Sequence, residues 1–291
     1  MTDWNTPKPT TYTPGDLAQA LGVSVSTVKR WADQGRFPTR RTEGGHRRIP
    51  REAALALLER SGVDPSLLPG ETPLATRRLD DEAGTLQQLL RQGREVEVTS
   101  RVLTMHRYGW DLANILHHGI APALRQLGTL WQEGHGGIYA EHRATRIAER
   151  LVHTVRHQWL GDHTTAPLAM GGAPPDDAHG LASAMAATVL EEAGWHVVDL
   201  GAYTPITVLA DAARKQGAGL VWMALGGPDA PEVTYDRLAS LRERLGQDPE
   251  DAVIVVGGPR VPEWSFQPPE GVVRVDTLPE LRRLALSVIS E

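Results

Sequence analysis

The chain has 291 residues, of which 41% are apolar, and its formal net charge is −6. This length is sufficient for two or three domains of ordinary size. The absence of cysteine excludes disulfides, zinc–thiolate sites, iron–sulfur clusters and cysteine nucleophiles. The first ten residues are polar, and no segment approaches the roughly 18 apolar residues of a membrane span. We therefore expect a cytoplasmic protein without a signal peptide or a membrane partner.

The charge is distributed unevenly along the chain. Residues 1–60 contain ten lysines and arginines against six acidic residues, whereas the remainder contains twenty against thirty. A basic head on an acidic body is expected when one module meets phosphate groups and the other does not. Chance clustering is the alternative that charge alone leaves open.

Two short helices around a glycine turn are predicted near the start of the chain. Thr13 can cap a first helix that begins at Pro14, and Gly22 predicts the turn that follows it. Ser24 or Ser26 can then cap a second helix. This is the pattern of a helix-turn-helix, in which the second helix enters the major groove of DNA. The polar residues that this helix would offer to DNA are Ser26, Thr27, Lys29 and Arg30.

A basic hairpin is predicted next, because Gly44-Gly45 is a hairpin turn signal. Another amphipathic helix opens near Pro50. A basic hairpin that follows a helix-turn-helix is a wing that can grip the DNA backbone. The wing residues expected to contact DNA are Arg40, Arg41, His46, Arg47 and Arg48.

The segment from Tyr12 to Leu58 resembles the MerR-type winged helix-turn-helix. The resemblance rests on V-S-x-x-T-V-K-R-W-A-D-Q-G-R-F-P and on T-E-G-G-H-R-R. It implies a DNA-binding domain over residues 10–60 that recognises a double-stranded operator. A small helical protein-interaction domain is the alternative interpretation of these helices.

A helical middle region follows a linker. Residues 61–76 contain three prolines and two glycines without periodicity, so we expect a linker that lets the head move relative to the body. Helices are predicted over 80–92, 94–105, 108–130 and 141–160, with a break near residue 120 that Gly119 and Pro122 indicate. Four helices of this length predict a four-helix bundle over residues 77–162.

The joint between the last two of these helices is richer than a connector needs to be. It contains Trp131, several glycines and the pair Glu141-His142 at a helix start. These residues are candidates for a binding site. The alternative is that Trp131 caps the core of the bundle and that Glu141 and His142 are solvated.

Residues 166–291 alternate between short apolar runs and helices, which predicts a doubly wound α/β domain with a parallel, Rossmann-like sheet. We expect strands at 167–170, 196–200, 220–225, 252–256 and 272–275, and helices at 181–193, 206–216, 233–245 and 278–289. Ligands of such sheets lie beyond the carboxyl ends of the strands. The loops there are small, polar or glycine-rich, and none has the spacing of a dinucleotide fingerprint or a Walker motif.

The pair Asp177-x-His179 follows the first of these strands. A neutral imidazole is a good ligand for cobalt or iron, and a carboxylate commonly orients its second nitrogen. A solvated loop histidine is the alternative.

The order of helical bundle, D-x-H loop, L-G-x-x-T-P and G-G resembles the cobalamin-binding domains of the methionine-synthase type. Together with the preceding tryptophan and E-H pair, the chain resembles the CarH/LitR family over residues 12 to about 290. This family consists of light-responsive MerR regulators that use adenosylcobalamin.

The resemblance implies roles for individual residues around the cofactor. His179 would be the lower axial ligand of cobalt and the single metal ligand, with Asp177 as its partner. Trp131 would pack over the upper face against the adenosyl group, Glu141 would hydrogen-bond that group, and His142 would lie beside it. The nucleotide tail would lie in a groove that is shaped by Gly201, Thr204, Gly257 and Gly258.

The chain departs from the family pattern at several positions. Ala182 stands where the family's D-x-H-x-x-G has glycine, and Met223-Ala224-Leu225 stands where it has S-x-L, so that Met223 and Leu225 would face the tail without the hydroxyl group. Gln132 follows Trp131, where light-sensing members have a histidine that can bind cobalt. Either Gln132 fails in that role or His135 substitutes for the histidine.

The resemblance implies a DNA-binding transcriptional repressor and photoreceptor that is not an enzyme. Adenosylcobalamin and light would control it through homo-oligomers, dimers or tetramers, that gather several DNA heads. One alternative is a MerR-like regulator whose sensor has lost cobalamin, or binds another tetrapyrrole or a protein partner. Another is a corrinoid methyl-carrier protein, against which the basic winged head argues.

Overall fold

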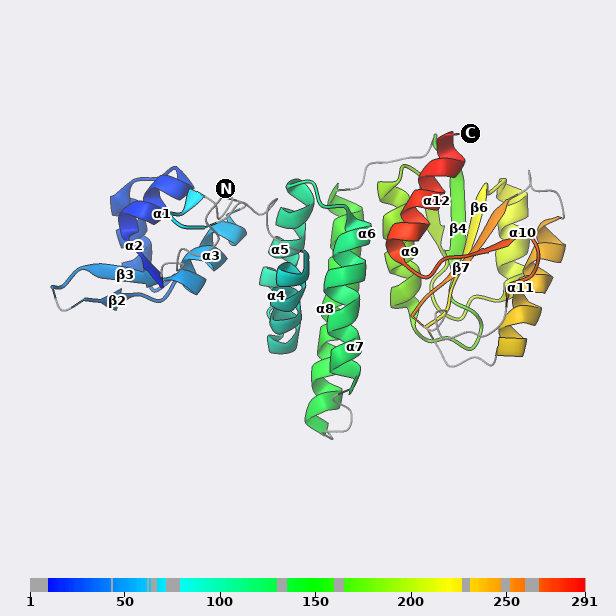
Figure 1. Cartoon of the computed structure of the whole chain (residues 1–291), viewed down its shortest axis with the longest axis horizontal. Coiled ribbons are helices and arrows are strands. Elements are labelled where there is room, and N and C mark those ends of the chain that lie inside the picture. The colour runs from blue at the N-terminus through cyan, green and yellow to red at the C-terminus, as the bar shows by residue number, and fades with distance from the viewer. Residues whose placement is uncertain are drawn as a thin grey trace, which may run out of the picture. The chain divides into compact units, whose positions relative to one another are not determined.

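The computed structural model describes residues 10–42, 44–61, 63, 67–71, 79–129, 135–159, 165–226, 231–246, 252–259 and 267–290. The chain divides into two compact units, Met1–Asp111 and Leu112–Glu291 (Figure 1). None of the helices in these ranges is both long and apolar enough to cross a bilayer.

The head of the first unit is the predicted winged helix-turn-helix. Helix α1 spans Pro14–Leu21 and α2 spans Val25–Asp33. Thr13 caps α1 in a reciprocal capping box with Asp16, and Gly22 ends it with φ at +65°. The wing consists of β2 (Arg40–Arg41) and β3 (Arg47–Pro50), and α3 (Arg51–Arg60) follows it.

A short strand at the start of the head was not predicted. Strand β1 (Thr11–Tyr12) pairs with β3, which gives a three-stranded antiparallel sheet in the order β1-β3-β2. Leu17, Val28, Ile49 and Leu58 are fully buried beneath this sheet and its helices. The sheet therefore anchors the wing to the core of the head.

Part of the predicted linker packs against the head. Leu68 belongs to the hydrophobic core of the head. The Glu71 carboxylate accepts hydrogen bonds from the Tyr12 hydroxyl at 2.7 Å and from the Arg51 guanidinium at 2.5 and 2.8 Å. Burial and the adjacent Glu71 carboxylate raise the pKa of Tyr12. The linker expectation therefore needs correction at residues 67–71, because this stretch is fastened to the head.

The first unit also contains α4 (Leu79–Gln92) and α5 (Glu95–Arg107). These two helices pack on each other, and α5 also contacts α3. Their buried residues include a charged pair, in which the Arg101 guanidinium donates to Glu82 at 2.6 Å. Both helices lie within two residues of the predicted bounds.

The second unit begins with the other two predicted helices. Helix α6 (Leu112–Asn114) continues through a π-helical segment (Ile115–Ile120) into α7 (Ala121–Thr129). The break predicted near residue 120 is this π-helical segment. Helix α8 spans His135–Trp159 and starts six residues earlier than predicted. The helical region is confirmed, and its assembly into one four-helix bundle stays a prediction.

The predicted parallel sheet is confirmed. It consists of β4 (Leu168–Gly172), β5 (His196–Asp199), β6 (Leu220–Ala224), β7 (Val253–Gly257) and β8 (Val272–Arg274). All neighbours pair in parallel, in the order β5-β4-β6-β7-β8. In this order the chain reverses direction across the sheet between β4 and β6, which is where ligands of doubly wound sheets bind.

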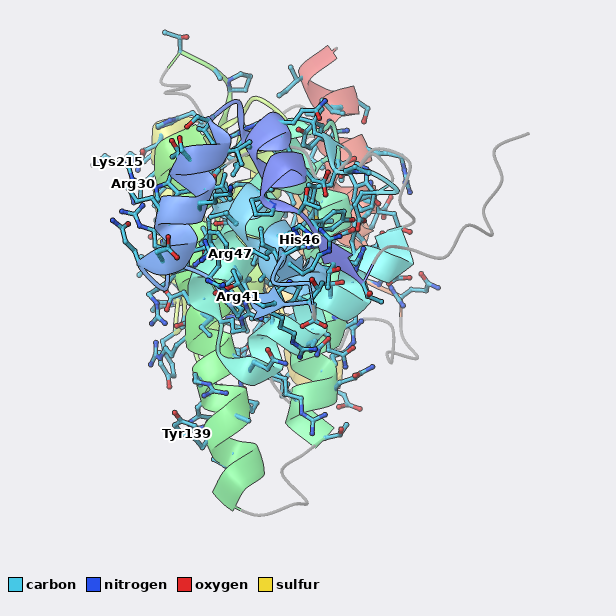
Figure 2. All side chains as sticks on the ribbon, turned by 90° about the vertical axis from the view of Figure 1, so that its left-hand side faces the viewer. Arg30, Arg41, His46, Arg47, Tyr139 and Lys215 are labelled. Atoms are coloured by element: carbon cyan, nitrogen blue, oxygen red, sulfur yellow. The ribbon has the colours of Figure 1, made fainter. Side chains whose placement is uncertain are left out.

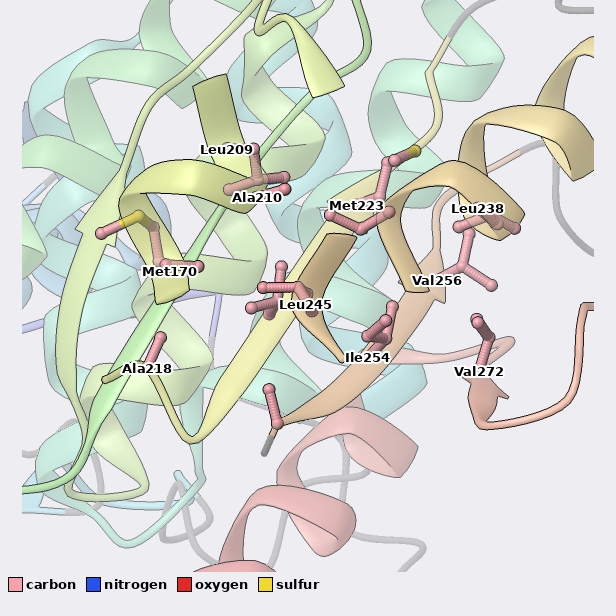
Figure 3. Packing of buried hydrophobic residues seen from close by; sticks show 14 of the residues in the cluster. Met170, Leu209, Ala210, Ala218, Met223, Leu238, Leu245, Ile254, Val256 and Val272 are labelled. Carbon is pink, nitrogen blue, oxygen red and sulfur yellow. The ribbon is translucent and has the colours of Figure 1, made fainter. Parts of the chain in front are cut away.

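Helices cover the sheet. Helices α10 (Ile206–Gln216) and α11 (Pro231–Leu245) bury one hydrophobic cluster with the strands, in which Met170, Met223 and Ile254 meet Leu209 and Leu238 (Figure 3). Helices α9 (Gly180–Glu192) and α12 (Leu278–Ser290) pack against each other. The indole of Trp195 donates a hydrogen bond to Ala285 of α12 at 3.2 Å.

The buried carboxylate at Glu71 leads to a first prediction. Glu71→Gln removes the charge that faces Arg51 and should lower the free energy of unfolding of the head by about 2 kcal/mol, because a partly buried guanidinium loses its counter-charge. Urea denaturation followed by circular dichroism measures this change. Glu52→Gln, at an exposed acid on α3, is the matched control. Equal losses for both variants would show that residues 67–71 are not fastened as described.

Candidate functional site

The recognition helix α2 and the wing border a groove in the head. It is lined by Val25, Lys29 and Asp33 of α2, by residues 13–15 before and within α1, and by Arg41, Gly45, His46, Arg47 and Arg48 of the wing. The cavity volume is about 630 Å³. Arg30, Arg41, His46 and Arg47 lie on the side of the head that Figure 2 shows. A surface with this concentration of cationic side chains suits a phosphate backbone.

The DNA contacts expected on α2 are accessible. Ser26, Lys29 and Arg30 are exposed, and Thr27 is half-buried. The Ser24 hydroxyl, which caps α2, lies 2.7 Å from the Ser26 hydroxyl and 2.8 Å from that of Thr27. On the wing, Arg40, Arg41 and His46 are exposed and Arg48 is half-buried.

Arg47 connects the wing to the recognition helix. Its guanidinium donates to the Lys29 carbonyl at 3.1 Å and to the Asp33 carboxylate at 2.5 Å. Only 18% of its side chain is exposed. The sequence suggested a DNA contact at this position, and the geometry gives Arg47 the further task of holding the wing against α2.

A pair of variants separates these tasks. Arg41→Ala should weaken binding to a random-sequence duplex and reduce the slope of log K against log [salt] by about 0.9, because one phosphate contact is lost. Arg47→Lys keeps the charge but loses the two-pronged contact with α2, so it should weaken binding with a nearly unchanged slope. Fluorescence anisotropy between about 50 and 200 mM salt measures both. Identical slopes for the wild type and Arg41→Ala would remove Arg41 from the interface.

The second candidate site lies at the carboxyl end of the sheet, between the loops that follow β4 and β6. The Asp177 carboxylate is 2% exposed, and one of its oxygens accepts from both the backbone N–H and the Nδ1 of His179, each at 2.8 Å. The other oxygen accepts from the backbone N–H of Gly226 at 2.6 Å. One buried carboxylate thus joins the two loops at the switch point.

The contact with Asp177 decides which ring nitrogen of His179 a metal could use. Nδ1 is turned toward the carboxylate, so Nε2 is the ring nitrogen that points away from Asp177. The side chain of His179 is 68% exposed, so this nitrogen is open to a ligand from outside. Among the described residues, no group of three or more His, Cys, Asp or Glu side chains could hold a metal ion. The accessible imidazole of His179 can supply one ligand to a metal that brings its other ligands, such as the cobalt of a corrinoid.

Gly226 completes this site, and the sequence did not single it out. A Cβ atom at this position would lie 2.7 Å from the Cβ of His179 and 3.2 Å from an Asp177 carboxylate oxygen. Only glycine therefore allows the backbone to approach the pair. The available signal was its position directly after an apolar strand, within the Gly-rich loop 225–229.

Gly201 and Thr204 interlock the loops after β4 and β5. Thr204 is buried, and its hydroxyl donates to the Gly201 carbonyl at 3.0 Å while its backbone N–H donates to the Ala173 carbonyl at 2.9 Å. A Cβ at Gly172 would lie 2.6 Å from the Thr204 hydroxyl oxygen. These residues shape the loops beside His179.

Gly258 lets the chain after β7 approach Leu225 closely, and Gly257 lets β7 approach Val275. Gly258 has φ at +136°, and a Cβ there would lie 2.2 Å from the Leu225 carbonyl oxygen. Met223 and Leu225 were expected to face a nucleotide tail. Their side chains are 1% and 2% exposed and belong to the cluster under α10 and α11, because alternation along β6 turns them toward that face.

The residues expected above the cofactor lie on or before α8. Trp131, Gln132 and the side chain of His135 are outside the described residues. Glu141 accepts a hydrogen bond from the Thr145 hydroxyl at 2.7 Å and lies 3.5 Å from the His142 imidazole. The side chain of Glu141 is 21% exposed and that of His142 is 67% exposed.

A polar groove that sequence reasoning missed adjoins the His179 loop. Its volume is about 380 Å³. From α8 it is lined by the charged or titratable residues Arg146, Glu149, His153 and Arg156. The other lining residues lie on α9 and around the end of β5, and they are Gly180, Leu181, Ala184, Asp199, Leu200 and Gly201. Arg156 is held by Glu191 at 2.7 Å. These side chains recur every three or four residues along α8, which is the signal that could have grouped them.

Comparisons with known proteins match the head and the helical region. Residues 11–62 match the family model described as a helix-turn-helix domain, and residues 83–156 match the one described as a B12 binding domain. The HTH-type transcriptional repressor CarA of Myxococcus xanthus is 24% identical over 253 residues, which cover 83% of this chain and 84% of that protein.

Two corrinoid proteins of methanogens are also similar. Dimethylamine corrinoid protein 2 of Methanosarcina acetivorans is 23% identical over 155 residues, which cover 53% of this chain and 71% of that protein. The solved monomethylamine corrinoid protein of Methanosarcina barkeri superposes with a TM-score of 0.54 at 15% identity, covering 70% of this chain and 96% of that one. At this identity the superposition shows the fold. The chain has the domain organisation of a cobalamin-binding helix-turn-helix regulator of the CarH type.

The buried carboxylate gives a prediction with a built-in control. Asp177→Asn should lower the affinity for hydroxocobalamin by about 10–100-fold, because the carboxylate that orients the ligand histidine is lost. An absorbance titration of the purified protein measures this affinity. Asp176→Asn is the matched control, since the adjacent aspartate is 71% exposed and pairs with Arg237. Equal affinities for the two variants would contradict the assignment of Asp177.

Proposed function

We propose that this chain is a transcriptional repressor whose binding to DNA is controlled by adenosylcobalamin and by light, through ligand-dependent oligomerisation. The observation that carries the proposal is the presence, in one chain, of a basic winged head and a switch-point histidine whose Nδ1 is held by a buried carboxylate. The proposal is also supported by the relative that is named an HTH-type transcriptional repressor, because its alignment covers most of both chains.

The residues of the sensor would form two groups, those that hold cobalt and those that hold the adenosyl group. His179 would bind cobalt through Nε2, while Asp177 keeps the proton on Nδ1 and Gly226 closes the loop around the pair. When bound, adenosylcobalamin supplies a cobalt–carbon bond that light can break. By the family resemblance, Trp131, Glu141 and His142 would hold the adenosyl group on the upper side.

The output follows from multivalency. A single small head would contact few phosphates and bind weakly, whereas heads linked in one assembly would bind neighbouring half-sites with a high effective concentration. An assembly that forms with the ligand and dissociates after illumination would therefore convert light into a large change in operator occupancy.

In this proposal, light control depends on residues before and at the start of α8. Gln132 stands where light-sensing members have a histidine, and its amide is a much poorer cobalt ligand than an imidazole. In this proposal His135 replaces it. His135→Ala would then preserve the dark response and weaken the response to light.

A second function is favoured by a specific observation in the sheet. The Trp222 ring covers Gly171, where a Cβ would lie 2.1 Å from it, and its indole donates to the Ser183 hydroxyl at 3.0 Å. With Met223 also buried, the sheet is closely packed at the positions near the expected nucleotide tail. This packing favours a regulator that binds a tetrapyrrole without a tail, or that acts through a protein partner.

An electrophoretic mobility shift on the promoter of the chain's own gene tests the proposal. Wild-type protein with adenosylcobalamin in the dark should give the tightest and slowest-migrating complex, with at least about tenfold weaker binding after green light or without cofactor. The four conditions are protein with and without adenosylcobalamin, each in the dark and after green light. His179→Ala should bind the promoter equally in all four conditions, at the level of the cofactor-free wild type. Equal binding by the wild type in all four would contradict control by both cofactor and light.

A further inference from the structure

Tyr203 combines a strained backbone with an exposed aromatic ring. Its φ is +56°, and among the described residues it is the only one other than glycine in the left-handed region. Its side chain is 60% exposed. A bulky residue in this conformation costs about 1 kcal/mol or more, and a ring left in water recovers little of that through burial. The cost of this conformation is therefore not offset by burial of the ring.

The position of Tyr203 links it to the candidate cofactor site. Its backbone N–H donates to the carbonyl of Asp177 at 3.2 Å, so the strained residue is fastened directly to the residue that holds His179. The loop around it also lies against the start of α9, where a Cβ at Gly180 would be 3.7 Å from the Cβ of Ala202. The loop that carries Tyr203 is therefore packed against the residue that holds His179 and against the helix that follows His179.

Tyr203 has exposed apolar neighbours in the sequence, and we call Leu200, Tyr203 and Val208 the apolar rim. Their exposed fractions are 37%, 60% and 53%. Of the three, Leu200 lines the polar groove that adjoins the His179 loop. An exposed apolar side chain beside a polar groove is typical of a surface that a ligand or partner covers.

We infer that the Tyr203 ring is a contact surface for the corrinoid beside His179, and that the left-handed backbone of Tyr203 is retained because it presents this ring. The inference rests on the proposed cobalamin binding and adds a residue to it. A corrin ring offers a broad apolar edge with amide side arms. A tyrosine matches both features, because its ring packs on apolar surface and its hydroxyl can donate to an amide oxygen.

The inference makes a paired prediction, because strain and binding respond in opposite directions. Tyr203→Asn places a residue that tolerates the left-handed region at this position. It should leave the thermal unfolding midpoint of the cofactor-free protein unchanged or raise it by about 1–3 °C. It should also weaken hydroxocobalamin binding by about tenfold, since the ring contact is lost.

The experiment compares full-length wild type, Tyr203→Asn, Tyr203→Phe and His179→Ala, each by thermal denaturation without cofactor and by absorbance titration with hydroxocobalamin. Tyr203→Phe keeps the ring and should bind within about threefold of the wild type. If the wild type binds and Tyr203→Asn binds equally well, the inference is wrong while the proposed function stands. If Tyr203→Phe loses as much affinity as Tyr203→Asn, the ring is not the contact. If the wild type does not bind cobalamin, both proposals fail.

Size-exclusion chromatography of the same variants excludes a different occupant of the rim. The inference predicts that cofactor-free wild type and Tyr203→Asn have the same oligomeric state. A change in oligomeric state with unchanged cobalamin affinity would assign the rim to a second copy of the chain, and would overturn the inference.

Discussion

The Asp177 carboxylate is the interaction on which the sensor depends. It is buried, and it accepts from the His179 backbone, from the His179 ring and from the Gly226 backbone. A buried carboxylate is tolerated only when such donors satisfy it, so the two loops at the switch point must close together around it. The same three hydrogen bonds leave the outer nitrogen of His179 exposed. The hydrogen bonds that pack the two loops together are therefore the same ones that orient His179.

The head has a comparable organisation on a smaller scale. Arg47 fastens the wing to the recognition helix through Lys29 and Asp33, and Glu71 fastens residues 67–71 to the sheet and to α3 through Tyr12 and Arg51. Within the first unit, α3 of the head also packs on α5, so the head is joined to the helices that follow it by side-chain packing as well as by the chain.

The sequence predicted most of the elements, because each has a local signature. The strands of the parallel sheet are short apolar runs between helical periods, and the predicted helix at 206–216 coincides with α10. Likewise, Asp177 and His179 are two residues apart, so their pairing could be inferred from the loop itself. Strand β1 was missed because two residues have no periodicity, and its existence depends on pairing with β3.

The remaining features depend on contacts between distant positions. Gly226 meets Asp177 across 49 positions, and Glu71 meets Tyr12 across 59. No local pattern distinguishes such a glycine from a turn glycine, or such a glutamate from a solvated one. Met223 is a case in which a local motif was misleading. The family motif placed its side chain near the cofactor tail, but alternation along β6 turns that side chain into the core. The strain at Tyr203 is likewise visible only in the backbone.

The most direct test of the account is whether a nitrogen of His179 binds the cobalt. Electron paramagnetic resonance of the protein loaded with cobalamin and reduced to the cobalt(II) state reports the axial nitrogen through superhyperfine splitting. Protein grown with ¹⁵N-histidine should change each triplet to a doublet, and His179→Ala should abolish this change. Triplets that persist in the labelled wild-type protein would show that the axial nitrogen comes from the cofactor itself, and would contradict the assignment of Asp177, His179 and Gly226 as the cobalt site.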